Sequence, residues 1–294
     1  LAAFPGQPPP FLKDSNINQL VFTAITILPL SCLKSVSRLR YASLVSVFSM
    51  VYITVAIMIR ALFVGYDAES EDTTRPLAST HGIQLYVCSW DFFVGLTITF
   101  FAFASHINLF AVYSTVADPT VKRMQKIARR SVAAELLLYS AFAVCGYLSF
   151  HEHTPPNIVS KYGKTDGLFV AGRVALLSSL SVVCPLIFAP AHADIDRIFF
   201  SDHPFSWPRH LIVSFCLVGA ALALALYIPD IASVFSVLGA TFAVLFCFFL
   251  PMSIYLRVSD SSTQVKVGLL TLLVLIGVAS AISVARVLTT PKLT

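Results

Sequence analysis

Three polar residues, Ser105, His106 and Asn108, lie close together in the middle of a long apolar stretch. The stretch covers residues 86–116. As one straight helix it would be about 46 Å long, whereas the hydrocarbon core of a bilayer is about 30 Å thick. Polar groups at mid-depth are costly and mark binding sites by default. The pattern therefore favours a helix that is interrupted near these residues, with a functional site at the interruption. The alternative is a hydrogen bond from a buried His106 to a neighbouring helix.

A second group of polar atoms lies beside a proline in the apolar run 168–190. Pro185 has no N–H, so the carbonyl of Ser181, four residues earlier, loses its helical partner. Ser178 lies three residues before Ser181 and therefore on the same face of the helix. Two hydroxyls and a free carbonyl are hard oxygen ligands, so Ser178 and Ser181 are candidate ligands of a small cation, such as the coupling ion of a transporter. The simpler alternative, which the pattern alone favours, is that the hydroxyls only compensate a proline kink.

The composition is that of a membrane protein. Of the 294 residues, 57% are hydrophobic and 12% are charged, which is about half the charged fraction of a typical soluble domain. The mean hydropathy is +0.81. Most of the chain is needed for apolar spans, and the sequence has no phosphate-binding glycine loop and no H-E-x-x-H motif. We therefore expect neither an enzyme nor a cofactor. No nucleic-acid partner is expected either, because the basic residues lie in short loops.

Eight apolar runs are long enough to cross a bilayer. They are residues 17–33, 41–64, 86–116, 125–150, 168–190, 209–228, 231–255 and 266–288. These runs predict an all-α polytopic membrane protein with eight transmembrane helices in one transmembrane domain, residues 17–288. Residues 1–16 are expected to be an extracytosolic linker or the remnant of an amino-terminal part, and residues 289–294 a short carboxy-terminal tail.

Basic residues are concentrated in alternate connections between the runs, which orients the helices. The third connection carries Lys122, Arg123, Lys126, Arg129 and Arg130. The second connection, residues 65–85, instead holds four acidic residues and a single arginine. Odd-numbered connections are therefore predicted to be cytosolic, and both ends of the eight-helix chain extracytosolic. Because no signal for translocation precedes the first span, we expect that an odd number of further helices precedes it and that this chain is a fragment.

Three other features have a structural and a functional interpretation. Glu135 is expected near the cytosolic end of its helix, paired with Arg129 or Arg130, with a proton-coupling role as the alternative. The segment Gly239-Ala-Thr241 is expected to let two helices pack closely. The basic run Lys122–Arg130 is the signal of a cytosolic loop and is also suited to contact anionic lipid.

Three segments together carry the motifs of one known family. They are Phe101-Ala-Phe-Ala-Ser-His-Ile-Asn-Leu-Phe-Ala-Val-Tyr-Ser114 with Asp118-Pro-Thr-Val-Lys-Arg-Met124 after it, Arg173 to Pro185, and Tyr227-Ile-Pro-Asp-Ile-Ala-Ser-Val-Phe-Ser-Val-Leu-Gly-Ala-Thr241. In this order they resemble the sixth helix and its following loop, the eighth helix, and the ninth-to-tenth helix signature of the amino acid/auxin permease family. The likeness is to its sodium-coupled neutral amino acid transporters and covers nearly the whole chain from about residue 17.

The resemblance implies a protein of eleven helices with a five-plus-five inverted repeat, in which the eight runs found here are helices four to eleven. It also implies that the first and sixth helices are unwound at mid-membrane and hold the amino acid. Carried over to this sequence, the substrate-binding residues are those of the unwound part, namely Phe103, Ala104, Ser105, His106 and Asn108. Ser181 matches the threonine of the family's eighth helix that contributes to the sodium site.

The sequence also departs from the family pattern. Ser105 stands where many members have cysteine, Ile107 stands where some have a second histidine, and Ser181 keeps the hydroxyl of threonine without its methyl group. The largest departure is the family's first helix, which supplies much of the contact with substrate and sodium and is not among these residues. A chain of only these residues is not expected to transport.

The resulting hypothesis is secondary active transport of amino acids, coupled to sodium or protons, across the plasma membrane or a lysosome- or vacuole-like membrane. The expected partners are an amino acid substrate and the lipid bilayer. The alternative is a non-transporting protein, either an amino-acid sensor or a degenerate paralogue, that binds without carrying and acts through protein partners. The sequence indicates neither which amino acid is bound nor which ion is coupled, and it identifies no protein partner.

Overall fold

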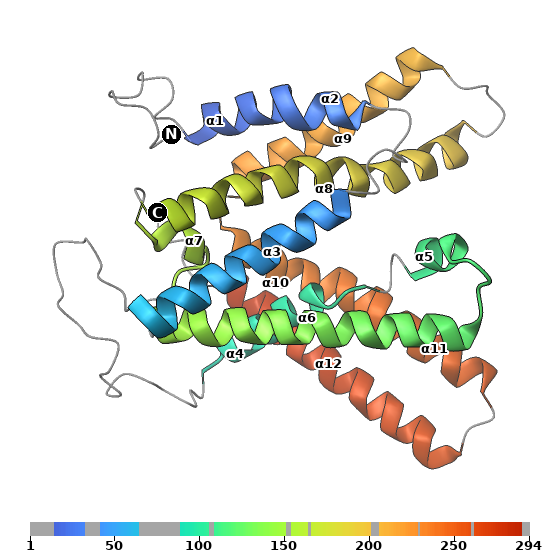
Figure 1. Cartoon of the computed structure of the whole chain (residues 1–294). Coiled ribbons are helices and arrows are strands. Elements are labelled where there is room, and N and C mark those ends of the chain that lie inside the picture. Colours follow the sequence, from blue (N-terminus) through green and yellow to red (C-terminus); the bar gives the residue numbers. More distant parts are fainter. Residues whose placement is uncertain are drawn as a thin grey trace, which may run out of the picture. The chain divides into compact units, whose positions relative to one another are not determined.

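The computed structural model describes nine segments of the chain. They are residues 15–32, 42–64, 89–105, 109–150, 154–163, 166–200, 206–228, 230–259 and 262–289. All regular secondary structure within these segments is helical, as Figure 1 shows. The all-α fold class predicted from the sequence is confirmed for the described part of the chain.

Six of the described helices are long and apolar enough to cross a membrane. They are Ser43–Leu62, Val121–Phe150, Gly167–Phe199, Trp207–Tyr227, Ile231–Val258 and Thr263–Thr289. Two further apolar helices, Asn16–Ser31 and Asp91–Ala102, are shorter than a full span. Six of the eight predicted runs therefore coincide with a long helix, whereas the first and third coincide with the two short ones. The protein is an integral, multi-pass membrane protein.

The helices form two compact units, and the first unit joins residues 1–82 to residues 141–229. Its described helices are α1 (Ser15–Phe22), η2 (Thr23–Ile27), α2 (Leu28–Ser31), α3 (Ala42–Ile59), η4 (Arg60–Val64), the last part of α6 (Val121–Phe150), α7 (Ile158–Lys161), α8 (Gly167–Phe199) and α9 (Trp207–Tyr227). Within this unit α3 packs along α8 (Figure 1). Ile53 and Ile57 of α3 and Phe169 of α8 lie in one buried apolar cluster, which holds the two helices together.

Polar contacts fix the start of α8. Asp166 is its N-cap residue and accepts a hydrogen bond from the N–H of Leu168 at 3.1 Å. The same carboxylate accepts from Nε of Arg60 at 3.0 Å, so it ties η4 to α8. Arg173, in the second turn of α8, donates to the carbonyl of Tyr162 at 2.6 Å. The connection that precedes α8 is therefore bound to the helix by charged side chains.

The other end of α8 is tied to α9 and α2 by two buried histidines. Nε2 of His192 lies 3.1 Å from the carbonyl oxygen of His210, and Nε2 of His210 lies 3.2 Å from the carbonyl oxygen of Cys32. Because a carbonyl oxygen only accepts, both Nε2 atoms act as donors. Nε of Arg209 lies 3.2 Å from the carboxylate of Asp196 beside them. The sequence analysis did not predict this group, because its members are distant in the chain.

The second unit joins residues 83–140 to residues 230–294. Its described helices are α4 (Asp91–Ala102), α5 (Leu109–Thr115), the first part of α6, α10 (Ile231–Leu238), η8 (Gly239–Phe249), α11 (Leu250–Val258) and α12 (Thr263–Thr289). α10, η8 and α11 follow one another directly and together form the predicted span 231–255. α4 packs against α10, η8 and α12 within this unit.

The backbone of α4 comes very close to Gly239, the first residue of η8. A Cβ atom placed on Gly239 would overlap the carbonyl oxygen of Thr97 and lie 2.6 Å from its carbonyl carbon. Only a residue without a side chain fits there unless α4 moves. The close packing predicted for the segment Gly239-Ala-Thr241 is therefore confirmed at Gly239.

The stretches η2, η4 and η8 have the wider π-helical hydrogen bonding. At the end of η8, for example, the N–H of Leu250 bonds to the carbonyl of Leu245, five residues earlier. Pro251, which has no N–H to donate, follows directly. The sequence analysis did not predict these stretches, because an apolar run gives the same signal whichever helical hydrogen bonding it adopts. π-helical turns occur frequently at functional sites.

Candidate functional site

The long apolar stretch 86–116 is interrupted where its polar residues lie. α4 ends at Ala102 and α5 begins at Leu109, and the described residues 103–105 that follow α4 are not helical (Figure 1). The predicted break in this stretch is confirmed. The residues 91–115 include no proline, so the interruption does not come from a missing N–H donor.

The structure describes three of the five predicted substrate residues. Phe103 and Ala104 are half-buried and Ser105 is exposed. His106 and Asn108 lie outside the described residues. Whether these five residues hold a substrate stays a prediction, which the proposed function below takes up.

The backbone leaves α4 through two tight turns. The N–H of Phe103 still reaches the carbonyl of Thr99 at 3.1 Å, as in a helix. The N–H of Ala104 then bonds to Phe101 at 3.1 Å, and that of Ser105 bonds to Phe103 at 2.8 Å. The bonds of Ala104 and Ser105 no longer follow the α-helical spacing, and the last carbonyls of a helix in general lack α-helical partners. These carbonyls lie at the negative end of the helix dipole, so the end of α4 favours a positively charged group.

The side chain of Phe103 is held by an aromatic contact. Its ring meets that of Tyr139 on α6 nearly edge to face, with 5.4 Å between the ring centroids and 70° between the planes. Such pairs contribute about 0.5–1.5 kcal/mol beyond the area they bury. The sequence analysis did not single out Tyr139, since one tyrosine in an apolar helix has no distinguishing pattern.

Two polar contacts attach α4 to the helices beside it. The hydroxyls of Thr97 (α4), Ser236 (α10) and Ser283 (α12) lie 2.8–3.0 Å from one another, and all three residues are 0% exposed. At the start of α4, Asp91 accepts a hydrogen bond from Nε of Arg286 on α12 at 2.9 Å. The sequence analysis missed both contacts, because isolated hydroxyls in apolar runs look alike until the fold brings some of them together.

Ser178 and Ser181 lie on α8, which continues through Pro185 without interruption. Ser181 is buried and Ser178 is exposed. Their hydroxyls donate to the carbonyls one turn earlier, those of Leu177 at 2.7 Å and Val174 at 2.8 Å. Neither hydroxyl donates to the carbonyl of Ser181 that Pro185 leaves without its usual partner. The hydroxyl oxygen of Ser181 keeps its capacity to accept, and whether Ser178 and Ser181 hold a cation stays a prediction.

Comparison with known proteins identifies the family. The family model described as "Transmembrane amino acid transporter protein" matches residues 10–290. The chain belongs to this family. It is also similar to sodium-coupled neutral amino acid symporter 2 of Danio rerio, with 24% identity over 264 residues, or 84% of this chain. These residues cover 52% of the symporter, so the chain spans about half the length of the curated relative. No solved structure matches the chain.

The family predicted from the three sequence motifs is therefore confirmed. The match covers both units of the structure, from the first described helix to the last. Membership identifies an integral membrane protein of the amino acid transporter type. Within that type, the interruption after Ala102 falls inside the first of the three motifs, at the polar residues that distinguish it.

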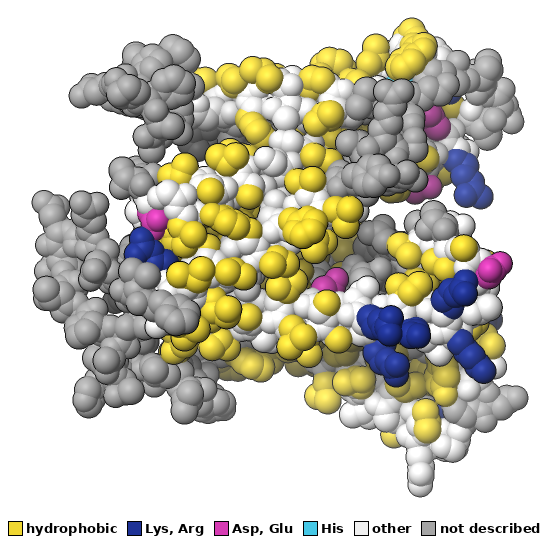
Figure 2. All heavy atoms as spheres, viewed as in Figure 1, with side chains coloured by type: hydrophobic (Ala, Val, Ile, Leu, Met, Phe, Trp, Pro, Cys, Tyr) yellow, Lys and Arg dark blue, Asp and Glu magenta, His cyan; other side chains and the backbone are white. Residues whose placement is uncertain are grey.

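Basic residues of this transporter-family chain gather at one end of α6. Figure 2 shows Lys and Arg side chains grouped over the first turns of the helix, and the exposed residues there are Lys122, Arg123, Lys126, Arg129 and Arg130. Glu135 was expected to pair with one of the last two, but in the described part of the chain it forms no ion pair with either. Glu135 is half-buried and lies one turn before Tyr139, whose ring contacts that of Phe103.

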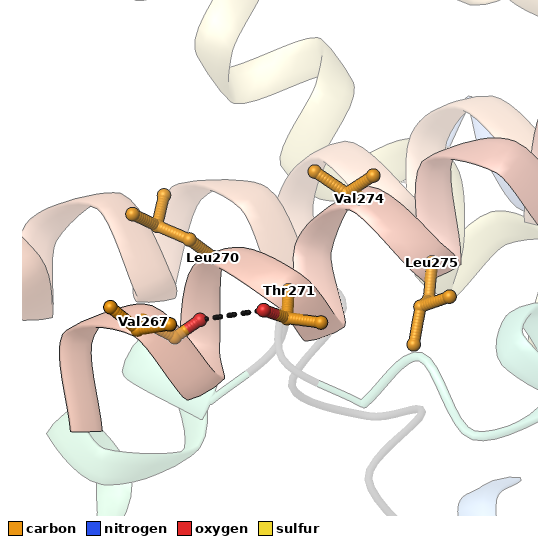
Figure 3. A pocket seen from close by; sticks show the side chains of 5 residues that line it. All are labelled: Val267, Leu270, Thr271, Val274 and Leu275. Carbon is orange, nitrogen blue, oxygen red and sulfur yellow. Dashed lines mark hydrogen bonds between the residues drawn. The ribbon is translucent and has the colours of Figure 1, made fainter. Parts of the chain in front are cut away.

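A shallow hollow on α12 carries no comparable chemistry. Figure 3 shows its lining, which comes from one face of that helix and consists of Val267, Leu270, Thr271, Val274 and Leu275. The hydroxyl of Thr271 already donates to the carbonyl of Val267 at 2.9 Å. An apolar surface of this kind suits lipid chains rather than a zwitterionic solute, so the interrupted helix remains the candidate site of this transporter-family chain.

Proposed function

We propose that this protein carries amino acids across a membrane by secondary active transport and that the interruption between α4 and α5 is its substrate site. The observation that carries the proposal is the end of α4 at Ala102, within the motif that resembles the family's substrate helix. The proposal includes eight membrane spans, equivalent to family helices four to eleven, and the five-plus-five inverted repeat.

The chemistry of the break suits an amino acid. The carbonyl oxygens at the end of α4 are suited to accept hydrogen bonds from the ammonium group, which the helix dipole also favours there. Ser105 offers an exposed hydroxyl to the same solute. The aromatic contact with Tyr139 restrains Phe103, so its ring gives the site a fixed apolar wall. We assign the selection of the substrate side chain to His106 and Asn108.

Sodium is the coupling ion that we propose, because the similar protein from Danio rerio is named a sodium-coupled neutral amino acid symporter. Ser181 is the stronger candidate ligand, since it is buried and its carbonyl lacks the N–H of residue 185. Ser178 is exposed and is the weaker candidate. Sodium prefers several oxygen ligands, so further oxygens must complete the site. Coupling to protons is the alternative, and Glu135 is then the first residue to test.

Uptake by the full-length protein in liposomes tests the proposal. A radiolabelled neutral amino acid is offered under an imposed sodium gradient, an imposed proton gradient, or neither. We expect saturable uptake with the sodium gradient and none without sodium. Uptake that follows the proton gradient and is lost in Glu135→Gln would replace sodium by protons. Substrate binding without uptake under either gradient would favour the non-transporting sensor. The absence of both binding and uptake would contradict the proposed site.

Ser181→Ala tests the sodium site against a matched control. Ser49 on α3 belongs to the same unit, is similarly buried, and donates to the carbonyl one turn earlier at 2.8 Å. Ser49→Ala therefore removes a hydroxyl of the same kind from a helix without the candidate site. We expect Ser181→Ala to raise the sodium concentration for half-maximal uptake at least fivefold and Ser49→Ala to leave it unchanged. Equal effects would exclude Ser181 as a ligand.

A further inference from the structure

The three buried hydroxyls of Thr97, Ser236 and Ser283, here called the hydroxyl cluster, join three different helices of one unit. The oxygen–oxygen distances are 3.0 Å from Thr97 to Ser236 and 2.8 Å for both other pairs. All three residues are 0% exposed, so no solute reaches the cluster in this arrangement. A hydroxyl buried in an apolar medium is costly unless it is hydrogen-bonded, and these three supply one another's partners.

The hydroxyls of the cluster can satisfy one another's donors and acceptors. Each hydroxyl has one proton to donate, so a ring in which each donates once satisfies all three contacts. The carbonyl of Val94, 3.0 Å from Oγ1 of Thr97, is a second acceptor for the proton of Thr97. Each residue takes part in two of the three contacts. Removal of any one hydroxyl therefore breaks two contacts and leaves one.

The contact that remains differs among the three removals. Without the hydroxyl of Thr97, the surviving pair joins α10 to α12 and α4 is no longer attached through the cluster. Without that of Ser236 or Ser283, the surviving pair still joins α4 to α12 or to α10. Loss of Thr97 is therefore the one removal that detaches α4 from the cluster, although each of the three removals breaks two of the contacts between the hydroxyls.

The attachment point lies close to the interruption. Thr97 precedes Ala102 by five residues, or about 7.5 Å along the helix. Gly239 lets η8 approach the backbone at Thr97, and Asp91 bonds to Arg286 at the start of α4. These contacts hold α4 at its start and in its middle. In the last turn, the rings of Phe100 and Phe101 lie against those of Phe248 and Phe235, so they add apolar contacts to the polar attachment at Thr97.

We infer that the hydroxyl cluster is a positioning device, in which Thr97 fixes the depth and direction of the end of α4 and thereby the geometry of the substrate site. Thr97 acts through the backbone of residues 99–104 and does not touch the solute. This inference rests on the proposed function for its consequence in transport. Its structural part, that Thr97 restrains the last turn of α4, stands independently of any substrate.

Hydrogen–deuterium exchange on the full-length protein in lipid nanodiscs tests the structural part without substrate. The variants are Thr97→Val, which keeps the shape of the side chain, and Ser236→Ala and Ser283→Ala, which break as many contacts elsewhere in the cluster. We expect Thr97→Val to speed amide exchange in residues 99–104 at least fivefold. We expect the two serine variants to change it less than twofold and Thr97→Ser, which keeps the hydroxyl, to behave like the wild type.

Uptake kinetics test the consequence. We expect Thr97→Val to raise KM at least threefold with little change in the maximal rate per folded transporter, and Thr97→Ser to restore it. Equal exchange in all three hydroxyl-removing variants, or a lower unfolding temperature in Thr97→Val with unchanged exchange and KM, would overturn the inference. If Thr97→Val does not fold, Thr97→Ala removes the same hydroxyl from a smaller side chain. Wild-type protein that neither binds nor transports amino acids refutes the proposed function, and the exchange data still decide the positioning role.

Discussion

Two helical stretches of this molecule differ from what their proline content alone would predict. α8 contains two prolines, Pro185 and Pro190, and runs unbroken for 33 residues. The stretch that forms α4 and α5 contains no proline and stops being helical after Ala102. In this protein, therefore, α8 stays continuous where prolines remove backbone donors, whereas α4 ends where a group of polar residues lies in mid-span.

The surroundings of each helix supply the physical reason. α8 is capped by Asp166, packed along α3 and tied by His192 to α9, so the loss of two backbone hydrogen bonds is shared with many supporting contacts. α4 is held by buried polar contacts as far as the hydroxyl cluster at Thr97, and by ring contacts of Phe100 and Phe101 in its last turn. Beyond Ala102, the described residues 103–105 are not helical, and Ser105 there is exposed and not buried in an apolar helix, where its hydroxyl would be costly.

The largest effect is expected when a side chain is added where α4 meets η8. Gly239→Ala forces α4 away from η8, because the new methyl group overlaps the carbonyl of Thr97. We expect a loss of about 3 kcal/mol in the free energy of unfolding. Gly172→Ala on α8 is the control, since a Cβ atom there lies an ordinary 3.6 Å from Ile53 and 3.7 Å from Tyr52.

The free energy of unfolding of both glycine variants is measured by heat or denaturant unfolding in detergent. Gly172→Ala is expected to change stability by less than about 1 kcal/mol, in the stabilising direction, because alanine favours a helix over glycine. Equal destabilisation by the two variants would show that the approach of Gly239 to the carbonyl of Thr97 is no closer than ordinary helix packing, and would contradict the tight attachment of α4 to η8.

A smaller effect is expected at the start of α8. Asp166→Ala removes both the N-cap of this helix and the partner of Arg60, which is largely buried with it. Asp230→Ala removes only an exposed N-cap, which accepts from the N–H of Ser233 on α10. We expect a loss of about 2 kcal/mol for the first and about 1 kcal/mol for the second. Chemical unfolding measures the free energy of unfolding of both variants. A larger loss of stability for Asp230→Ala than for Asp166→Ala would mean that the ion pair with Arg60 contributes nothing to the stability of α8.

The smallest effect is expected from removing the proline itself. Pro185→Ala is predicted to change the free energy of unfolding by less than about 1 kcal/mol, because α8 is already continuous and well supported. If the carbonyl of Ser181 is a sodium ligand, the N–H that the variant gains will compete for it, and the sodium requirement of uptake will rise about threefold. Stabilisation by several kcal/mol would instead show that Pro185 strains α8.

Part of this account was predictable from sequence alone. Apolar run lengths predicted eight spans, six of which coincide with a long helix, and the excess length of residues 86–116 together with Ser105, His106 and Asn108 predicted the break. These signals are local, so they survive without knowledge of the fold. The family followed from three motifs in their shared order and is confirmed by the match over residues 10–290.

The contacts that hold the candidate site were not predictable. Thr97, Ser236 and Ser283 are separated by 139 and 47 positions along the chain, and nothing in the local sequence distinguishes them from the hydroxyls that bond to their own helix. Tyr139 is equally ordinary until Phe103 lies against it. Glu135 shows the opposite error, because its nearness to Arg129 and Arg130 in sequence predicted an ion pair that the structure does not contain.

The central claim is that an amino acid binds at the end of α4. Hydrogen–deuterium exchange of the full-length protein with and without a neutral amino acid, in the presence of sodium, tests it most directly. We predict that the amino acid protects the amides of residues 103–105 at least fivefold and leaves those of residues 186–189 in α8 unchanged. Bound amino acid that protects α8 and leaves residues 103–105 unaffected would contradict it.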